Sequence, residues 1–127
     1  MENGESSKRP HERLDVWRDA MALVETVYRL SRSFPDSERF GLTSQVRRSA
    51  VSIPSNIAEG AARRSTSEYL RFLSIARGSL SELDTQFQIA ARLDYVDVPL
   101  EFGSRIDTIF ARLTALMNAL EKTGTAR

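Results

Sequence analysis

The chain has 127 residues, of which 41% are hydrophobic, and its formal net charge at neutral pH is +1. This length is typical of a single domain that buries its own hydrophobic core. The absence of cysteine excludes disulfide bonds and thiolate metal sites, and no apolar run approaches the length of a membrane span, so we expect a cytoplasmic protein with no membrane partner.

The first predicted helix follows a polar segment. Residues 1–12 lack hydrophobic periodicity and are predicted to form a disordered tail. At 13–33 two neighbouring apolar stripes recur at steps of three and four, which predicts a helix. The stripes are Leu14, Trp17, Met21, Val24 and Tyr28, and Val16, Ala20, Leu23, Val27 and Leu30. Because this apolar arc is wide, either the helix packs between two partners in the bundle or one stripe faces another subunit.

A second helix is predicted at 38–60, after a short connection. Its apolar stripe consists of Leu42, Val46, Ala50, Ile53 and Ile57. Pro54 lies inside this helix and predicts a kink, because proline lacks the N–H group and its ring clashes with the preceding turn. Gly60 is predicted to end the helix in the left-handed conformation.

The third helix is predicted at 66–93. Ser65 and Glu68 have the spacing of a capping box at its start. Gly78 and Ser79 inside it predict a close crossing, most simply against the second helix.

The fourth helix is predicted at 98–122, with Pro99 in its first turn, where proline is tolerated. Residues 123–127 are predicted to fray. Short links between long amphipathic helices predict an all-α fold, an antiparallel up-down-up-down left-handed four-helix bundle over 13–122.

Three segments carry a resemblance to a known family. The stretch RRSAVSIPSNIAEG at 47–60 follows FGLTSQ at 40–45, and FLSIARGSLSEL occupies 72–83. A weaker third stretch covers 16–21, with Phe34 and Pro35 further on. Together, over roughly residues 14–96, they resemble a bacterial family of small four-helix-bundle proteins first noticed as reading frames inside intervening sequences of 23S ribosomal RNA genes.

The resemblance implies a fold and an assembly, but no established activity. The residues that match the family pattern are Asn56, Glu59, Gly60, Ser79 and Glu82. A ring-shaped homo-oligomer is implied, pentameric in known relatives, with a suspected nucleic-acid role. Similarity to accessory proteins of diversity-generating retroelements further implies a reverse transcriptase or an RNA-processing enzyme as a partner.

Asn56 and Glu59 lie three residues apart, beside the apolar stripe of the second helix. Buried polar groups need hydrogen-bond partners, so we predict a structural polar network of Asn56 and Glu59 with Ser79 and Glu82. The alternative is a small catalytic or metal pocket. Metal sites in bundles usually add a Glu-x-x-His pattern, which this chain lacks, so we predict no catalytic residue, no metal site and no cofactor.

The middle of the chain is basic, since residues 39–77 carry seven arginines and two glutamates. The second helix, its following turn and the first half of the third helix hold the candidate nucleic-acid-binding residues Arg47, Arg48, Arg63, Arg64, Arg71 and Arg77. Guanidinium groups match phosphate geometry, and no base-stacking aromatic is evident on this face, so we expect recognition of the nucleic-acid backbone. The alternative is a solvated face with local ion pairs, such as Glu68 with Arg71.

The leading hypothesis is therefore a non-enzymatic homo-oligomer that binds RNA or DNA through phosphates. The second is a structural or protein-interaction scaffold without nucleic-acid binding, whose arginines form ion pairs between subunits. A third is an enzyme that uses Glu59 and Glu82.

Overall fold

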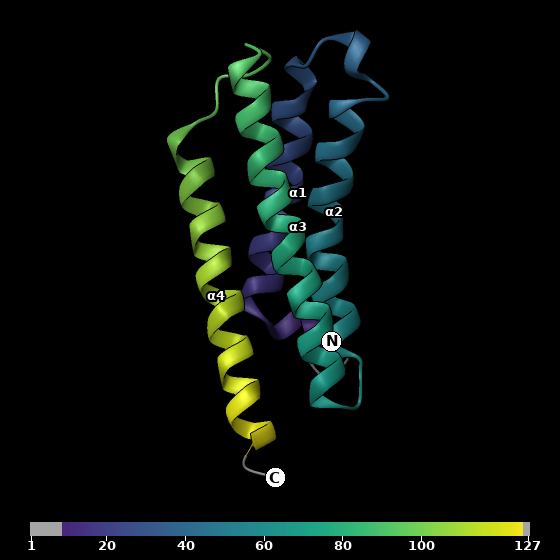
Figure 1. The fold of residues 1–127 in the computed structure, drawn as a ribbon, viewed down its shortest axis with the longest axis vertical. Coiled ribbons are helices and arrows are strands. Elements are labelled where there is room, and N and C mark those ends of the chain that lie inside the picture. Colours follow the sequence, from purple (N-terminus) through teal and green to yellow (C-terminus); the bar gives the residue numbers. More distant parts are fainter. Residues whose placement is uncertain (1–8, 126–127) are drawn as a thin grey trace, which may run out of the picture.

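The computed structural model describes residues 9–125, and within that range the protein is helical and contains no strand (Figure 1). The long helices are α1 (Asp15–Leu30), α2 (Leu42–Ala61), α3 (Thr66–Arg92) and α4 (Leu100–Thr125), and short 3-10 helices are η1 (Pro10–Arg13), η2 (Ser31–Ser33) and η3 (Asp36–Glu38). The predicted all-α fold is confirmed, and the arrangement is that of a four-helix bundle. None of the helices described is long and apolar enough to cross a membrane.

The helices lie side by side, with successive connections at opposite ends of the bundle (Figure 1). α2 and α3 form the most extensive pair, α1 packs against α2 and α4, and α4 packs against α3. The core between them is built from aliphatic and aromatic side chains of all four helices, among them Leu23, Val27, Ile53, Ile57, Leu80, Leu83, Phe87, Ile109 and Leu113.

The two stripes of α1 have different surroundings. Val16, Ala20, Leu23 and Val27 belong to the core of this single chain. In the other stripe, Met21 and Tyr28 remain 44% and 40% exposed. Leu14, Trp17 and Val24 of the same stripe are partly buried against the core. Both stripes therefore pack largely within this chain, and only the exposed parts of Met21 and Tyr28 are left for a further contact.

Both ends of the chain are more ordered than predicted, where the structure describes them. Part of the expected 1–12 tail forms η1, because Arg18 donates a hydrogen bond to the Glu12 carbonyl (2.6 Å) and the His11 ring packs edge-on against Trp17. At the other end, α4 includes residues 123–125 of the segment expected to fray. Residues 1–8 and 126–127 lie outside the described range.

Gly60 has a different role from the one predicted. α2 continues through the buried Pro54 and through Gly60 to Ala61, and no glycine of the described chain has a positive φ. A Cβ atom at Gly60 would lie 3.0 Å from the Cβ of Phe72 and 3.2 Å from the carbonyl oxygen of Tyr69. Gly60 therefore allows α3 to approach α2 closely. At Gly78, where the close crossing was predicted, an added Cβ would meet nothing within 4 Å.

The start of α2 is fixed by Glu38, which precedes the helix. Its carboxylate accepts the N–H of Leu42 (2.9 Å) and the hydroxyl of Tyr95 (2.9 Å), and the Ser33 hydroxyl donates to the Tyr95 carbonyl (2.8 Å). These bonds join the α1–α2 connection to the α3–α4 connection. The connection after α3 turns at Asp94, which has a φ of 62°. The predicted cap of α3 is present, because Ser65 Oγ accepts the N–H of Glu68 (3.2 Å).

We predict opposite effects for alanine at the two helical glycines. Gly60→Ala should lower the free energy of unfolding by about 1–3 kcal/mol, because the new methyl group overpacks against α3 backbone and Cβ atoms. Gly78→Ala should raise it by up to about 1 kcal/mol through helix propensity alone. Urea unfolding followed by circular dichroism measures both, and a stabilised Gly60→Ala variant would contradict the close approach.

A second prediction concerns pH. The hydrogen bonds from Leu42 and then Tyr95 lower the pKa of Glu38 from its ordinary 4.5, and the bond to Glu38 raises the pKa of Tyr95 above 10.0. The stability that the Glu38 carboxylate contributes is thus present above pH 4.5 and is lost as pH falls through its lowered pKa. The stability that the Tyr95 hydroxyl contributes is present below pH 10.0 and is lost as pH rises through its raised pKa.

Tyr95→Phe should therefore reduce the urea midpoint at pH 7, and its difference from the wild type should shrink as pH falls through the lowered pKa of Glu38, where the carboxylate becomes protonated. Tyr28→Phe is the control, since no hydrogen bond of the Tyr28 hydroxyl occurs within residues 9–125. If the difference in urea midpoint between Tyr95→Phe and the wild type stayed constant from pH 7 to pH 3, the stability contributed by the Tyr95 hydroxyl would not depend on the Glu38 carboxylate.

Candidate functional site

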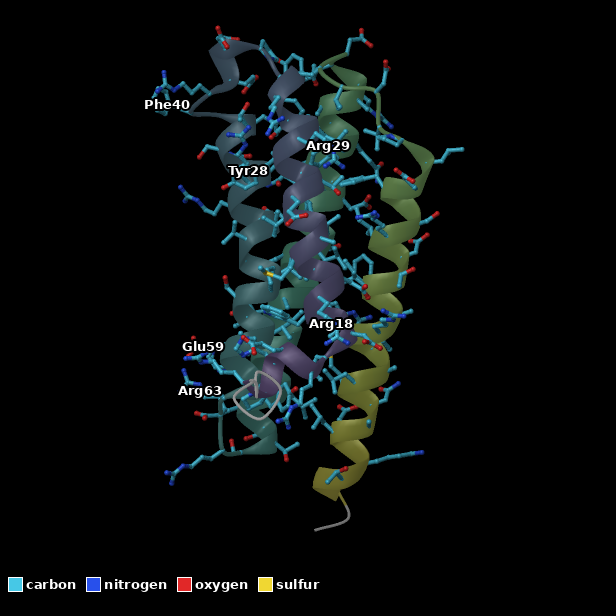
Figure 2. The ribbon with its side chains drawn as sticks, turned by 180° about the vertical axis from the view of Figure 1, so that it is seen from behind. Arg18, Tyr28, Arg29, Phe40, Glu59 and Arg63 are labelled. Atoms are coloured by element: carbon cyan, nitrogen blue, oxygen red, sulfur yellow. The ribbon has the colours of Figure 1, made fainter. Side chains whose placement is uncertain are left out.

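The six arginines singled out from the sequence do not form one patch. Arg47 and Arg48 lie in the first half of α2, whereas Arg63, Arg64 and Arg71 lie around the α2–α3 turn. From Arg48 to the end of α2 is about 20 Å at the rise of an α-helix. In Figure 2, Arg63 lies near one end of the bundle, and Phe40, which precedes α2, lies near the other.

Three of these arginines are held by contacts within the chain. The Nε atom of Arg47 donates to the hydroxyl of Ser31 (2.9 Å), and its guanidinium lies 4.6 Å from the centre of the Tyr28 ring. These contacts fasten α2 to the end of α1. Arg63 pairs with Glu59, and both Arg63 and Arg71 lie over the Phe72 ring, at 4.9 Å and 4.8 Å.

The other three are free to bind an anion. Arg48, Arg64 and Arg77 are exposed, and none has an ion pair or hydrogen bond with a side chain of residues 9–125. Arg48 differs from the other two because it lines two grooves.

The first groove, here called the basic-aromatic groove, has a volume of about 500 Å³. Its lining residues are Tyr28, Arg39, Phe40, Thr43, Ser44, Arg47, Arg48 and Val51. Three of them are arginines and none is acidic, so the groove is a site of positive potential. The guanidinium of Arg39 lies 5.1 Å from the centre of the Phe40 ring.

Phe40 is the most unusual residue of this groove, because 87% of it is exposed. Burying a phenylalanine side chain contributes about 1.5–3 kcal/mol, and Phe40 forgoes this in the free chain. Its position in the connection just before α2 aims the ring outward (Figure 2). Such a ring is suited to stack on a ligand or pack against a partner.

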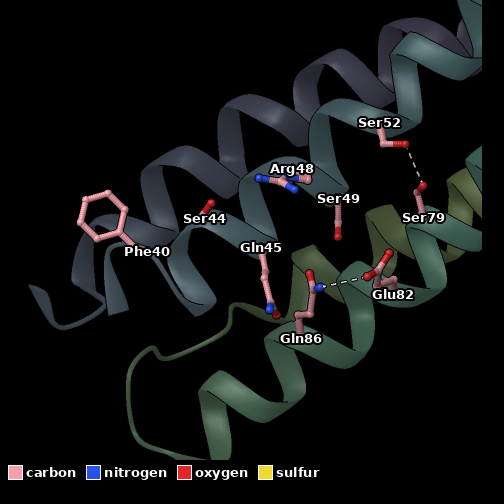
Figure 3. Close-up of a pocket in the computed structure, with 9 residues that line it drawn as sticks. All are labelled: Phe40, Ser44, Gln45, Arg48, Ser49, Ser52, Ser79, Glu82 and Gln86. Carbon is pink, nitrogen blue, oxygen red and sulfur yellow. Dashed lines mark hydrogen bonds between the residues drawn. The ribbon is translucent and has the colours of Figure 1, made fainter. Parts of the chain in front are cut away.

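The second groove, here called the polar groove, lies between α2 and α3 and has a volume of about 520 Å³ (Figure 3). It shares Phe40, Ser44 and Arg48 with the basic-aromatic groove, and its other lining residues are Gln45, Ser49, Ser52, Ser79, Glu82 and Gln86. Gln86 is 7% exposed, and its Oε1 atom is buried without a hydrogen-bond partner among the described residues.

The structure joins only part of the predicted polar network. Asn56 Nδ2 donates to the carbonyl (2.8 Å) and hydroxyl (2.9 Å) of Ser52, which in turn is bonded to the hydroxyl of Ser79 (2.9 Å). Glu59 instead pairs with Arg63, and Glu82 accepts a long bond from Gln86 Nε2 (3.5 Å). The two glutamates thus serve different neighbours.

The sequence patterns do not identify Arg39, Phe40, Tyr28 or Gln86 as groove residues. Tyr28 was assigned to an apolar stripe, and Phe40 to a helix whose apolar stripe excludes it. That exclusion was the usable signal, since a phenylalanine outside the stripe of an amphipathic helix is left exposed.

Among residues 9–125, no three His, Asp or Glu side chains are grouped so that they could hold a metal ion.

A family model described as "23S rRNA-intervening sequence protein" matches residues 12–118. No curated protein matches the chain.

The two adjacent arginines of α2 should behave differently on truncation. Arg47→Ala should lower the free energy of unfolding by about 1–3 kcal/mol, because it loses a charged hydrogen bond and a cation–π contact. Arg48→Ala should change it by less than about 0.5 kcal/mol. Urea unfolding compares the two, and equal losses would contradict the division into a structural and an available arginine.

Proposed function

The chain belongs to the family of 23S rRNA-intervening sequence proteins, and from its surface we propose that it is a non-enzymatic, self-associating protein that binds single-stranded nucleic acid. The basic-aromatic groove is the observation that carries this proposal. It combines three arginines and two exposed aromatic rings with no acidic residue in its lining.

The two kinds of side chain suit the two parts of a nucleotide. Guanidinium groups bind phosphates and release counterions, which makes the affinity fall with salt. Exposed aromatic rings stack on unpaired bases, which adds about 1–3 kcal/mol per base. Arg39 and Arg48 are placed to bind phosphates, and Phe40 is placed to stack on a base. Arg47 contacts the Tyr28 ring and keeps it in position at the groove wall.

Self-association would bring several copies of this groove together in one assembly. We take the bundle as antiparallel, up-down-up-down and left-handed, and its assembly as a ring, a pentamer by the resemblance noted above. Exposed apolar residues on the α3–α4 side, Ile89, Leu93 and Leu100, are candidates for the subunit contact. Copies of one groove around a ring would bind a long strand with greater avidity than one copy. A reverse transcriptase or RNA-processing enzyme is the protein partner we propose.

A second candidate function is a protein-interaction scaffold. The exposure of Phe40, together with Val51 and Tyr28 in the same groove, favours it, because exposed apolar groups are common at protein interfaces. In that case the arginines of the groove would pair with carboxylates of a neighbouring subunit or another protein.

The test is fluorescence anisotropy of a labelled single-stranded RNA at several salt concentrations. Arg39→Glu/Arg48→Glu should weaken binding about 100-fold at 0.1 M salt, and each lost phosphate contact should reduce the salt slope by about 0.7. Phe40→Ala should weaken binding about tenfold with an unchanged slope, since stacking releases no counterions.

The matched control is Arg64→Glu/Arg77→Glu, which makes the same charge change outside both grooves. An equal loss in this control would move the interface away from the groove. If the wild type bound neither RNA nor DNA at low salt, the nucleic-acid proposal would fail. Sedimentation velocity of the Arg39→Glu/Arg48→Glu variant would then test a scaffold in which the groove contacts a neighbouring subunit, because that contact requires that self-association be lost.

A further inference from the structure

We infer that the polar groove holds a guanine base of the strand that lies in the basic-aromatic groove. This inference rests on the proposed function and adds base selectivity to it. It starts from the buried Gln86 Oε1 atom, which has no hydrogen-bond partner among the described residues, and from the continuity of the two grooves.

The grooves meet at Phe40, Ser44 and Arg48, which line both. A strand whose phosphates contact Arg39 and Arg48 therefore passes the mouth of the polar groove. A base of that strand that enters the polar groove lies against the wall formed by α2 and α3. In Figure 3 the side chains of that wall point into the space between the two helices.

The deep end of the polar groove presents acceptors. Gln86 Nε2 is directed at the Glu82 carboxylate (3.5 Å), which leaves Gln86 Oε1 on the other side of the amide, unpaired and buried. Glu82 is exposed, and its carboxylate only accepts hydrogen bonds when ionised. A buried acceptor without a donor is unfavourable, so a ligand that supplies a donor gains affinity here.

Guanine is the base that matches two neighbouring acceptors. Its Watson–Crick edge places the N1–H and the N2 amino group side by side, whereas adenine and cytosine offer a single amino donor and uracil a single imino donor. Bases of unpaired strands are read on this edge. The amino group would donate to the Glu82 carboxylate and N1–H to Gln86 Oε1.

Gln45 lies beside the Gln86 amide in Figure 3, and it is exposed on the first turn of α2. A long exposed side chain changes rotamer at little cost. A change of rotamer at Gln45 would widen the approach to the Gln86 amide without a change in the backbone.

The experiment uses the full chain and labelled oligouridine strands with one central guanosine, inosine or adenosine. Inosine lacks only the amino group of guanine. The guanosine strand should bind about tenfold more tightly than the inosine or adenosine strand, which is the size expected for one hydrogen bond to a carboxylate. In Glu82→Gln the preference over inosine should fall to about twofold or less, because the partner of the amino group is lost. In Gln86→Leu the guanosine and inosine strands should both bind more weakly, because both carry N1–H, and in each variant the affinity for oligouridine should be unchanged.

Asp84→Asn is the matched control. Asp84 accepts from Gln88 (3.1 Å) in the same i, i+4 arrangement on α3, but it lines neither groove, so the guanosine preference should persist. Equal binding of all strands by the wild type would overturn the guanine site and leave the proposed function standing. Failure of every strand to bind would overturn both. Competition by free GMP as strong as that by the guanosine strand would show a site for free nucleotides and contradict the placement of the base within a strand.

Discussion

The close packing of α2 on α3 is the constraint on which the polar groove depends. Near the α2–α3 turn, Gly60 removes the side chain that would hold the helices apart, and further along Ser52 and Ser79 bond to each other across the interface. Because the side chains at these positions are small, they do not fill the outer edge of the α2–α3 interface. The polar groove is the space that results, and its walls are two long helices. Sites built on helices hold their side chains more precisely than sites built on loops.

The arginines show how one residue type serves two purposes in a small bundle. Arg47 and Arg63 each contact an aromatic ring and a polar neighbour, so their guanidinium groups are occupied by contacts inside the chain. Arg48 follows Arg47 directly, and one step of 100° around the helix takes it from the α1 contact to open grooves. A binding surface inferred from charge alone therefore overestimates the number of available cations. The available ones are those whose side chains the fold leaves without a partner.

Helical periodicity predicted the four helices to within a few residues, since the apolar seam of each helix is a local property of the sequence. The cap at Ser65 was predictable for the same reason. The function of Gly60 was not, because a glycine near a helix end has the same local pattern whether it turns the chain or admits a neighbour. Among the predicted polar residues, Asn56 and Ser79 came together through Ser52, a residue that the pattern did not single out. The grooves depend on how helices meet, and no single stretch of sequence contains that information.

The position of Phe40 between two fixed points has an entropic consequence. Before Phe40 in the chain, the Glu38 carboxylate accepts a hydrogen bond from the Tyr95 hydroxyl. After Phe40, the N–H of Leu42 donates to the same carboxylate. The short segment that carries Phe40 is therefore anchored at both ends. Ordering a loose loop during association costs free energy that is subtracted from the affinity. Here most of that ordering has taken place when the protein folds. A partner that docks on the ring therefore meets a surface with little backbone freedom left to lose, and weak individual contacts can add up to useful affinity.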